Sequence, residues 1–238
     1  MTTIVGIETR LKEKSAIVLA SDVTGTADNL EDHGDVILRR KTQSNYTKLY
    51  ASKNEQAILG MAGTIDERAC ELLTRAIAGE IEFEKIVRDG FFPEMRDLHI
   101  KRSENKVLKS GDTNSILLAY KGEDQVPRLY TCWPLGLVEH REGTAIGSGS
   151  DYAFSFINGE LARSLGQIDL TTKYEMLLPR GIELAVGAVR HAARDIYTKG
   201  LDLKILTPEG VRSYGKRITD ALDAAERDTL SQIIKENS

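Results

Sequence analysis

The sequence has 238 residues, 41% of them hydrophobic and 29% charged, which is an ordinary globular composition and suits one domain over residues 1–238. Its formal net charge of −4 gives no basic excess for nucleic acid, and no apolar run approaches the ~20 residues of a membrane-spanning helix. Because no signal peptide is visible and the two cysteines form no metal or redox motif, we expect a cytoplasmic protein without a nucleic-acid or membrane partner.

The first half of the chain is predicted to contain strands and then helices. Runs rich in β-branched residues predict strands, and the polar stretch 10–14 makes the first two a hairpin. Thr64 and Glu67 have the spacing of a capping box, so a helix is expected to begin there, and a second helical stretch should occupy residues 81–103. The predicted strands of this half are residues 2–7, 16–21, 47–51 and 56–61.

The second half continues with strands and longer helices. The glycine- and serine-rich stretch 147–150 is expected to lead into a helix. Thr172 and Glu175 form a second capping box, and the helix behind it should carry Leu177 and Ile182 on its apolar face. The predicted strands here are residues 115–120, 128–132, 144–146 and 201–206, and the predicted helices end near Ala162, Arg194 and Ile234.

The order of these elements predicts the fold class. Groups of strands alternate with pairs of helices, which is not the strict alternation of a doubly wound parallel sheet. The order suits an α+β fold with two mostly antiparallel sheets packed face to face and helix pairs on the outer sides. We therefore expect a four-layer αββα sandwich.

Motifs that would indicate a cofactor are incomplete. Residues 210–216 have the spacing of a phosphate-binding loop, but Arg217 stands where Ser or Thr would bind Mg²⁺, so a strand-to-helix turn is the better interpretation. The four histidines share no metal-ligand spacing, and no GxSxG nucleophile motif occurs. We therefore expect neither a metal nor an organic cofactor.

The N-terminus carries the pattern with the most chemistry. If an aminopeptidase removes Met1, Thr2 begins the chain with a hydroxyl and an amine on adjacent carbons. An unperturbed terminal amine has a pKa of roughly 7.7–8.0, so it can accept the hydroxyl proton near neutral pH. One residue can thus supply both nucleophile and general base. Many chains begin with Met-Thr, however, so an inert first strand also fits this observation.

Further segments follow the Met-Thr-Thr-Ile-Val opening in a fixed order: Val18-Leu-Ala-Ser-Asp22, Lys48-Leu-Tyr50, Gly60-Met-Ala-Gly63, Gly147-Ser-Gly-Ser-Asp-Tyr-Ala153 and Arg194-Asp-Ile-Tyr-Thr198. Together they resemble a 20S proteasome β-type subunit, and the opening and the Ile-Tyr-Thr triplet are also similar to the bacterial ring protease HslV. The resemblance spans roughly residues 2–206. It implies an N-terminal nucleophile hydrolase with an αββα sandwich, which agrees with the fold expected from the element order.

The resemblance implies a catalytic role for three of these residues. Thr2 resembles the nucleophile, Lys48 the catalytic lysine, and Asp22 the carboxylate that pairs with this lysine. An ammonium beside Thr2 would lower the cost of forming the alkoxide and would help to keep the terminal amine neutral. Asp22 would keep the lysine charged and oriented. The implied activity is that of a threonine-type endopeptidase that forms an acyl-enzyme on Thr2.

Other residues are implied to complete the site. Gly63 resembles the residue whose backbone N–H forms the oxyanion hole, where one donor can be worth ~3 kcal/mol of the barrier. The resemblance also implies residues that support the terminal amine and residues that contact the substrate. The former are Ser148, Asp195 and Thr198, and the latter are Gly25, Thr26 and Met61.

The resemblance also implies partners. The substrate would be a peptide or unfolded protein, and the chain would assemble into a homo-oligomeric ring, with α-type ring subunits or an ATPase unfoldase as further partners. The stretch from Asp22 to Lys48 is longer than usual for the family, in which it lies beside the substrate cleft. The extra residues could narrow the cleft, contact a neighbouring subunit or alter specificity.

Two alternative functions stay open. An amidase or a peptide ligase would form the same acyl-enzyme, which a ligase would pass to an amine. A structural ring subunit that retains Met1 would not be an enzyme, because a retained Met1 blocks both the nucleophile and the base.

Overall fold

The computed structural model describes residues 3–11, 14–32, 37–45, 48–62, 75, 78, 80, 115–133, 136–165, 176–192, 200–215 and 223–238. The helix expected to begin at Thr64 is described only at Arg75 and Ala78, which are helical. The helical stretch expected over residues 81–103 and the second capping box lie outside the described residues.

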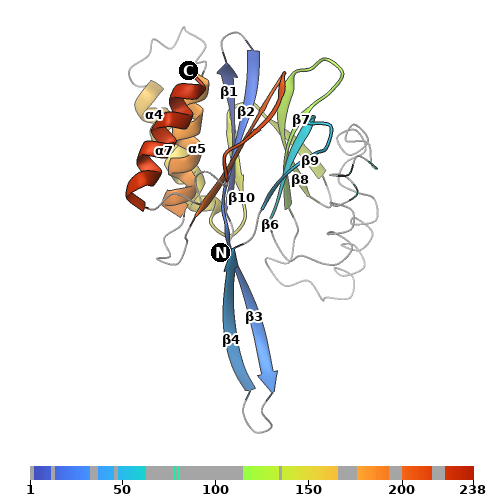
Figure 1. Ribbon diagram of the computed structural model, residues 1–238, viewed down its shortest axis with the longest axis vertical. Coiled ribbons are helices and arrows are strands. Elements are labelled where there is room, and N and C mark those ends of the chain that lie inside the picture. Colours follow the sequence, from blue (N-terminus) through green and yellow to red (C-terminus); the bar gives the residue numbers. More distant parts are fainter. Residues whose placement is uncertain are drawn as a thin grey trace.

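Two five-stranded antiparallel sheets form the body of the protein (Figure 1). Hydrogen-bonded neighbours follow the order β10-β1-β2-β11-β12 in the first sheet and β5-β6-β7-β8-β9 in the second. The strands of the first sheet are β1 (Ile4–Leu11), β2 (Lys14–Asp22), β10 (Gly143–Ile146), β11 (Leu201–Thr207) and β12 (Gly210–Ser213). Those of the second are β5 (Leu49–Ala51), β6 (Ala57–Ala62), β7 (Ser115–Lys121), β8 (Pro127–Trp133) and β9 (Gly136–His140).

The alternation of side chains along the central strands separates two hydrophobic cores. In β2, Ile17 and Leu19 belong to the core between the sheets, whereas Val18 and Ala20 belong to the core beneath the helices. The predicted hairpin of β1 and β2 is confirmed, and its register runs from Ile4↔Ser21 to Leu11↔Lys14. Fully buried residues of the core between the sheets include Ile4, Ile17, Leu19, Leu49, Ile58, Leu117 and Leu129.

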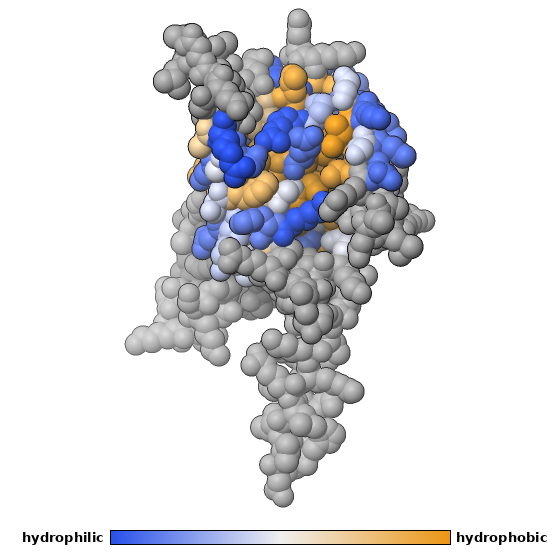
Figure 2. Space-filling model, turned by 90° about the vertical axis from the view of Figure 1, so that its left-hand side faces the viewer, coloured by the Kyte–Doolittle hydropathy of each residue, from blue (hydrophilic) through white to orange (hydrophobic). Residues whose placement is uncertain are grey.

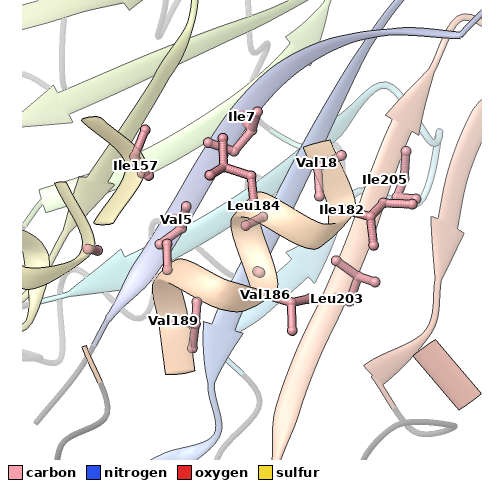
Figure 3. Packing of buried hydrophobic residues seen from close by; sticks show 14 of the residues in the cluster. Val5, Ile7, Val18, Ile157, Ile182, Leu184, Val186, Val189, Leu203 and Ile205 are labelled. Atoms are coloured by element: carbon pink, nitrogen blue, oxygen red, sulfur yellow. The ribbon is translucent and has the colours of Figure 1, made fainter. Parts of the chain in front are cut away.

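Helices cover the outer face of the first sheet (Figure 1). They are α4 (Ser150–Leu165), α5 (Leu178–Ala192) and α7 (Asp223–Glu236). Helix α5 packs on β1 and β2, where Ile182 and Val189 share a core with Val5, because its apolar residues recur at helical spacing (Figure 3). Leu177, which was expected on this face, is 59% exposed instead. It precedes the first helical residue and forms a β-bridge with Arg10.

These layers confirm the predicted α+β sandwich of two antiparallel sheets. The helices expected on the outer side of the second sheet fall almost wholly outside the described residues. On the helix-covered side, hydrophilic and hydrophobic residues are interspersed over the described surface (Figure 2). Among the helices that the structure describes, none is long and apolar enough to cross a lipid bilayer.

A two-stranded ribbon projects from the body between β2 and β5 (Figure 1). Its strands, β3 (Thr24–Asp32) and β4 (Ile37–Asn45), pair from Thr24↔Asn45 to Asp32↔Ile37. The sequence analysis predicted no strand here, because the segment is polar and lacks the β-branched alternation on which strand prediction depends. Strand β9, which is flanked by β8 and lies at a sheet edge, was missed as well.

The interpretation of residues 210–216 as a strand-to-helix turn is wrong in its first part. Residues Gly210–Ser213 form β12, which pairs with β11 from Thr207↔Gly210 to Lys204↔Ser213. Pro208 and Glu209 make the turn, and Gly210 adopts a φ of +141°, which favours glycine. The segment with the spacing of a phosphate-binding loop is thus one strand of a tight hairpin.

Two helical glycines provide a matched test of this packing. A Cβ at Gly181 of α5 would overlap Thr9 Cγ2 on β1, whereas a Cβ at Gly159 of α4 would meet no atom within 4 Å. We expect Gly181→Ala to lower the free energy of unfolding by about 1–3 kcal/mol through overpacking, and Gly159→Ala to raise it by about 0.5–1 kcal/mol. Chemical denaturation measures both changes. Equal effects of the two substitutions would contradict the close approach of α5 to β1.

Candidate active site

A buried ion pair joins the two sheets at one end of the sandwich. Asp22 is the last residue of β2 in the first sheet, and Lys48 directly precedes β5 in the second. Lys48 Nζ donates a hydrogen bond to Asp22 Oδ2 over 2.6 Å, and the two side chains are only 8% and 5% exposed. The structure therefore brings together two residues that lie 26 positions apart and that the sequence analysis paired.

The same carboxylate holds the start of the chain. The backbone N–H of Thr3 donates to Asp22 Oδ1 over 2.7 Å, and the N–H of Asp22 donates to the carbonyl oxygen of Thr3 over 3.2 Å. Each oxygen of Asp22 thus has its own donor, one from Lys48 and one from Thr3. Thr3, the residue after Thr2, is therefore held by the same carboxylate that binds Lys48.

Burial and the ion pair with Asp22 have opposite effects on the pKa of Lys48. Removal from water lowers its pKa below the ordinary 10.5, while the charge of Asp22 and the hydrogen bond to it raise the pKa in turn. The net direction is downward. Lys48 is therefore a cation that is held in one place and that loses its proton more readily than an exposed lysine does.

The loop before α4 packs against the start of the chain. Gly147 has a φ of +97°, which favours glycine, and the N–H of Ser150 donates to its carbonyl oxygen over 3.1 Å. A Cβ at Gly149 would overlap Thr3 Oγ1 and would lie 3.2 Å from Ala192 Cβ. The loop that contains Ser148 consequently lies close to Thr3, and Gly149 allows this approach.

The remaining predicted site residues are distributed as follows. Met61 is partly exposed near the end of β6, opposite Ile116. Gly25 and Thr26 lie at the base of the ribbon, in β3. Four predicted site residues lie outside the described residues, and their roles stay predictions: Thr2, Gly63, Asp195 and Thr198.

Sequence reasoning missed two residues that shape this region. It assigned no role to Thr3. The N–H of Thr3 donates to Asp22, and its side chain lies against the backbone of Gly149. It also treated Gly149 only as part of a motif. The run of alternating Gly and Ser was a signal for a close approach, but which segment approaches cannot be read from the run itself.

Comparison with known proteins adds a second kind of observation. The chain is 28% identical over 219 residues to proteasome subunit beta 1 of Thermococcus kodakarensis, and the match covers 90% of this chain and 93% of that protein. The chain is thus similar to a proteasome β-type subunit over most of its length. A shorter match to proteasome subunit beta 2 of Pyrococcus furiosus has 32% identity over 95 residues, covering 39% of this chain and 41% of that protein. No family model matches the chain.

The similarity to a proteasome β-type subunit implies the N-terminal nucleophile hydrolase fold, with which the two antiparallel sheets agree. Both of these relatives are proteasome β subunits. The similarities do not by themselves identify catalytic groups. For this chain, the contacts of Asp22 with Lys48 and Thr3 are the observation that bears on them.

The packing of Gly149 on Thr3 can be tested by a double-mutant cycle. Gly149→Ala alone should lower the free energy of unfolding by about 1–3 kcal/mol, because the new methyl group would overlap Thr3 Oγ1. In the Thr3→Ala background the obstructing oxygen is gone, so the same substitution should cost markedly less. Denaturant titration of the four proteins measures the coupling. Strictly additive effects would show that the loop and the start of the chain are not in contact.

Proposed function

We propose that this chain is a threonine-type endopeptidase subunit that hydrolyses peptide bonds through an acyl-enzyme on Thr2, once Met1 has been removed. The observation that carries the proposal is a pair of buried hydrogen bonds to Asp22, one from Lys48 Nζ and one from the Thr3 N–H. Consecutive Cα atoms are about 3.8 Å apart across a trans peptide. A chain that begins at Thr2 would therefore begin one residue from the atoms that bind Asp22.

The proposed first step forms the acyl-enzyme. The amine of Thr2 takes the proton of its own hydroxyl, and Oγ attacks the carbonyl carbon of the substrate. The oxyanion that develops accepts a hydrogen bond from the backbone N–H of Gly63. When the intermediate collapses, the C–N bond of the substrate breaks, the leaving nitrogen takes the proton from the Thr2 ammonium, and an ester on Oγ remains.

The second step returns the enzyme to its starting state. The Thr2 amine takes a proton from a water molecule, whose oxygen attacks the ester carbon. Collapse breaks the bond to Oγ, which takes the proton back, and a carboxylic acid product leaves. Throughout, the Lys48 cation stabilises negative charge on Oγ, and Asp22 keeps this cation in place. In the proposed site, Ser148, Asp195 and Thr198 support the amine, while Gly25, Thr26 and Met61 contact the substrate.

Assembly is part of the proposal. The named relatives are proteasome subunits, which supports a ring built from copies of this chain or from this chain and other subunits. Unfolded polypeptides are the proposed substrates. Partner α-type rings or an ATPase unfoldase belong to the proposal as further components, and size measurement of the purified protein would show which assembly forms.

The catalytic roles can be tested with two buried lysines. Thr2→Ala and Lys48→Met should both abolish peptide hydrolysis and labelling of residue 2 by an epoxyketone. Lys121 is the matched control, since the residue is buried to a similar degree and its Nζ donates to the carbonyl oxygen of Pro208 over 2.8 Å in another part of the structure. Lys121→Met should lower stability but keep hydrolysis. Unchanged hydrolysis in Thr2→Ala would falsify the mechanism.

Intact mass of the mature protein separates the alternatives. A protein that retains Met1 and resists the epoxyketone would be a structural subunit rather than a peptidase. A product in which an added amine has replaced the leaving group would indicate a peptide ligase. Simple hydrolysis products in the presence of that amine support the proposed endopeptidase.

The lowered pKa of Lys48 predicts the alkaline limb of the pH profile. Lys48 is a cation below its pKa and neutral above it, so stabilisation of the Thr2 oxygen is lost as the pH rises. Because burial lowers this pKa, the fall in kcat/KM should begin below the 10.5 of an ordinary lysine. Initial rates over an alkaline pH series measure it, with structural integrity followed by circular dichroism. A rate that stays constant through pH 10.5 would contradict the role of Lys48.

A further inference from the structure

The ribbon of β3 and β4 carries opposite charges on its two strands. Strand β3 contains three acidic residues and no basic one, whereas β4 contains three basic residues and no acidic one. These are Asp28, Glu31 and Asp32 in β3 and Arg39, Arg40 and Lys41 in β4. The base of the ribbon, residues 24–27 paired with residues 42–45, carries no charge. The outer half of the ribbon therefore has one acidic edge and one basic edge.

Both strands of the ribbon are edge strands. The ribbon is a two-stranded sheet of its own, and none of the other elements that the structure describes packs along it (Figure 1). Each strand has nine residues and can hydrogen-bond to a further strand along its outer edge. Because an isolated two-stranded ribbon is only marginally stable in water, further strands would stabilise it. The described part of the chain supplies no such strand.

The charges decide which edges can pair. Two acidic edges repel each other, as do two basic edges, because like charges directly opposite each other destabilise a strand pair. An acidic edge and a basic edge attract each other. A foreign partner of one charge would fit only one edge of the ribbon, whereas a second copy of this chain fits both. The partner whose charge pattern matches the ribbon is therefore another copy of the chain.

The register of the ribbon can be repeated between copies. Within one ribbon Asp28 stands opposite Lys41, and Leu30 stands opposite Arg39, on antiparallel strands. When neighbouring ribbons project in the same direction, β4 of one copy and β3 of the next are antiparallel as well, so the same residues can be opposed again. This contact joins two different edges and leaves each copy one edge for the next. Head-to-tail contacts of this kind produce a ring when the rotation closes.

We infer that the ribbon is an assembly arm: the acidic β3 edge of one copy pairs with the basic β4 edge of the next, over residues 28–32 and 37–41. This inference rests on the proposed assembly of copies into a ring, and it names the surface that joins them. The uncharged base of the ribbon, which contains Gly25 and Thr26, is left to the proposed contacts with substrate.

Disulfide cross-linking tests the register between copies. Asp28→Cys and Lys41→Cys are placed on separate chains that are co-expressed, so a disulfide between these two positions can join only two different molecules. Positions 28 of neighbouring copies would lie two strand spacings apart, about 9–10 Å, which exceeds the reach of a disulfide. We therefore expect a covalent dimer in the mixture and at least about tenfold less of it in either variant alone.

Wild-type protein, oxidised in the same way, is the control for the two native cysteines. A mixture without covalent dimer would overturn the inference. So would equal yields of dimer in the mixture and in Asp28→Cys alone, because such a result would indicate that like edges meet.

Charge reversal separates pairing between copies from pairing within one ribbon. Asp28→Lys/Asp32→Lys gives both edges a net positive charge, and Arg39→Glu/Lys41→Glu gives both a net negative charge. Each variant alone should need at least about tenfold more protein to assemble. An equal mixture of the two should assemble like the wild type. Inside each ribbon the charges still repel, so this recovery can come only from contacts between copies.

Glu123→Lys/Asp124→Lys is the matched control, since it reverses as many charges on the exposed turn between β7 and β8 and should assemble normally. Sedimentation velocity over a concentration series measures assembly, and circular dichroism shows whether each variant folds. A mixture that assembles no better than either charge-reversed variant would overturn the inference. Wild-type assembly in each charge-reversed variant would do the same. Cross-linking decides the question if a charge-reversed variant does not fold.

The outcome separates this inference from the peptidase mechanism. If the protein forms rings and hydrolyses peptide but gives no cross-link between positions 28 and 41, the mechanism stands and the arm is refuted. If the cross-link forms but Thr2→Ala is as active as the wild type, the mechanism fails and the arm stands. A wild-type protein that remains a monomer would refute the arm together with the proposed ring.

Discussion

The ion pair of Lys48 with Asp22 is the interaction on which the geometry of this site depends. Its two charges are almost wholly removed from water, and a buried charge is tolerated only when it is paired and hydrogen-bonded. Asp22 meets this requirement by accepting the Lys48 ammonium at one oxygen and the Thr3 N–H at the other. The constraint ties together three segments: the start of the chain, the end of β2 and the approach to β5.

The ribbon of β3 and β4 explains how the pair tolerates a long intervening segment. Thr24 and Asn45 lie opposite each other, so the chain that leaves Asp22 returns beside its own starting point. Extra residues lengthen the ribbon outward and leave its base unchanged. The additional length noted in the sequence therefore does not separate Asp22 from Lys48, and it projects from the body of the sandwich (Figure 1).

The sandwich also holds β1, the first strand of the chain, in a fixed position. Strand β1 lies between β2 and β10, and Ile4 is paired with Ser21 on one side and with Ile146 on the other. Ile4 is fully buried between the sheets, so the strand is held by its backbone and its side chain up to the residue after Thr3. Thr3, which directly precedes this central strand, is held as well by the hydrogen bond of its N–H to Asp22, and a catalytic residue at position 2 would need such an anchored neighbour.

The sequence by itself determined most strands of the body, because alternating and β-branched residues indicate which positions are buried. The ordered motifs also paired Asp22 with Lys48, which are in contact. It could not find β3, β4 or β12, since polar strands that pair only with each other, or strands in tight hairpins, leave no hydrophobic period. Nor could it show that Asp22 also binds the Thr3 N–H or that Gly149 packs on Thr3. Those contacts join residues far apart in the chain, and only the register of the strands and the stacking of the sheets bring them within hydrogen-bonding distance.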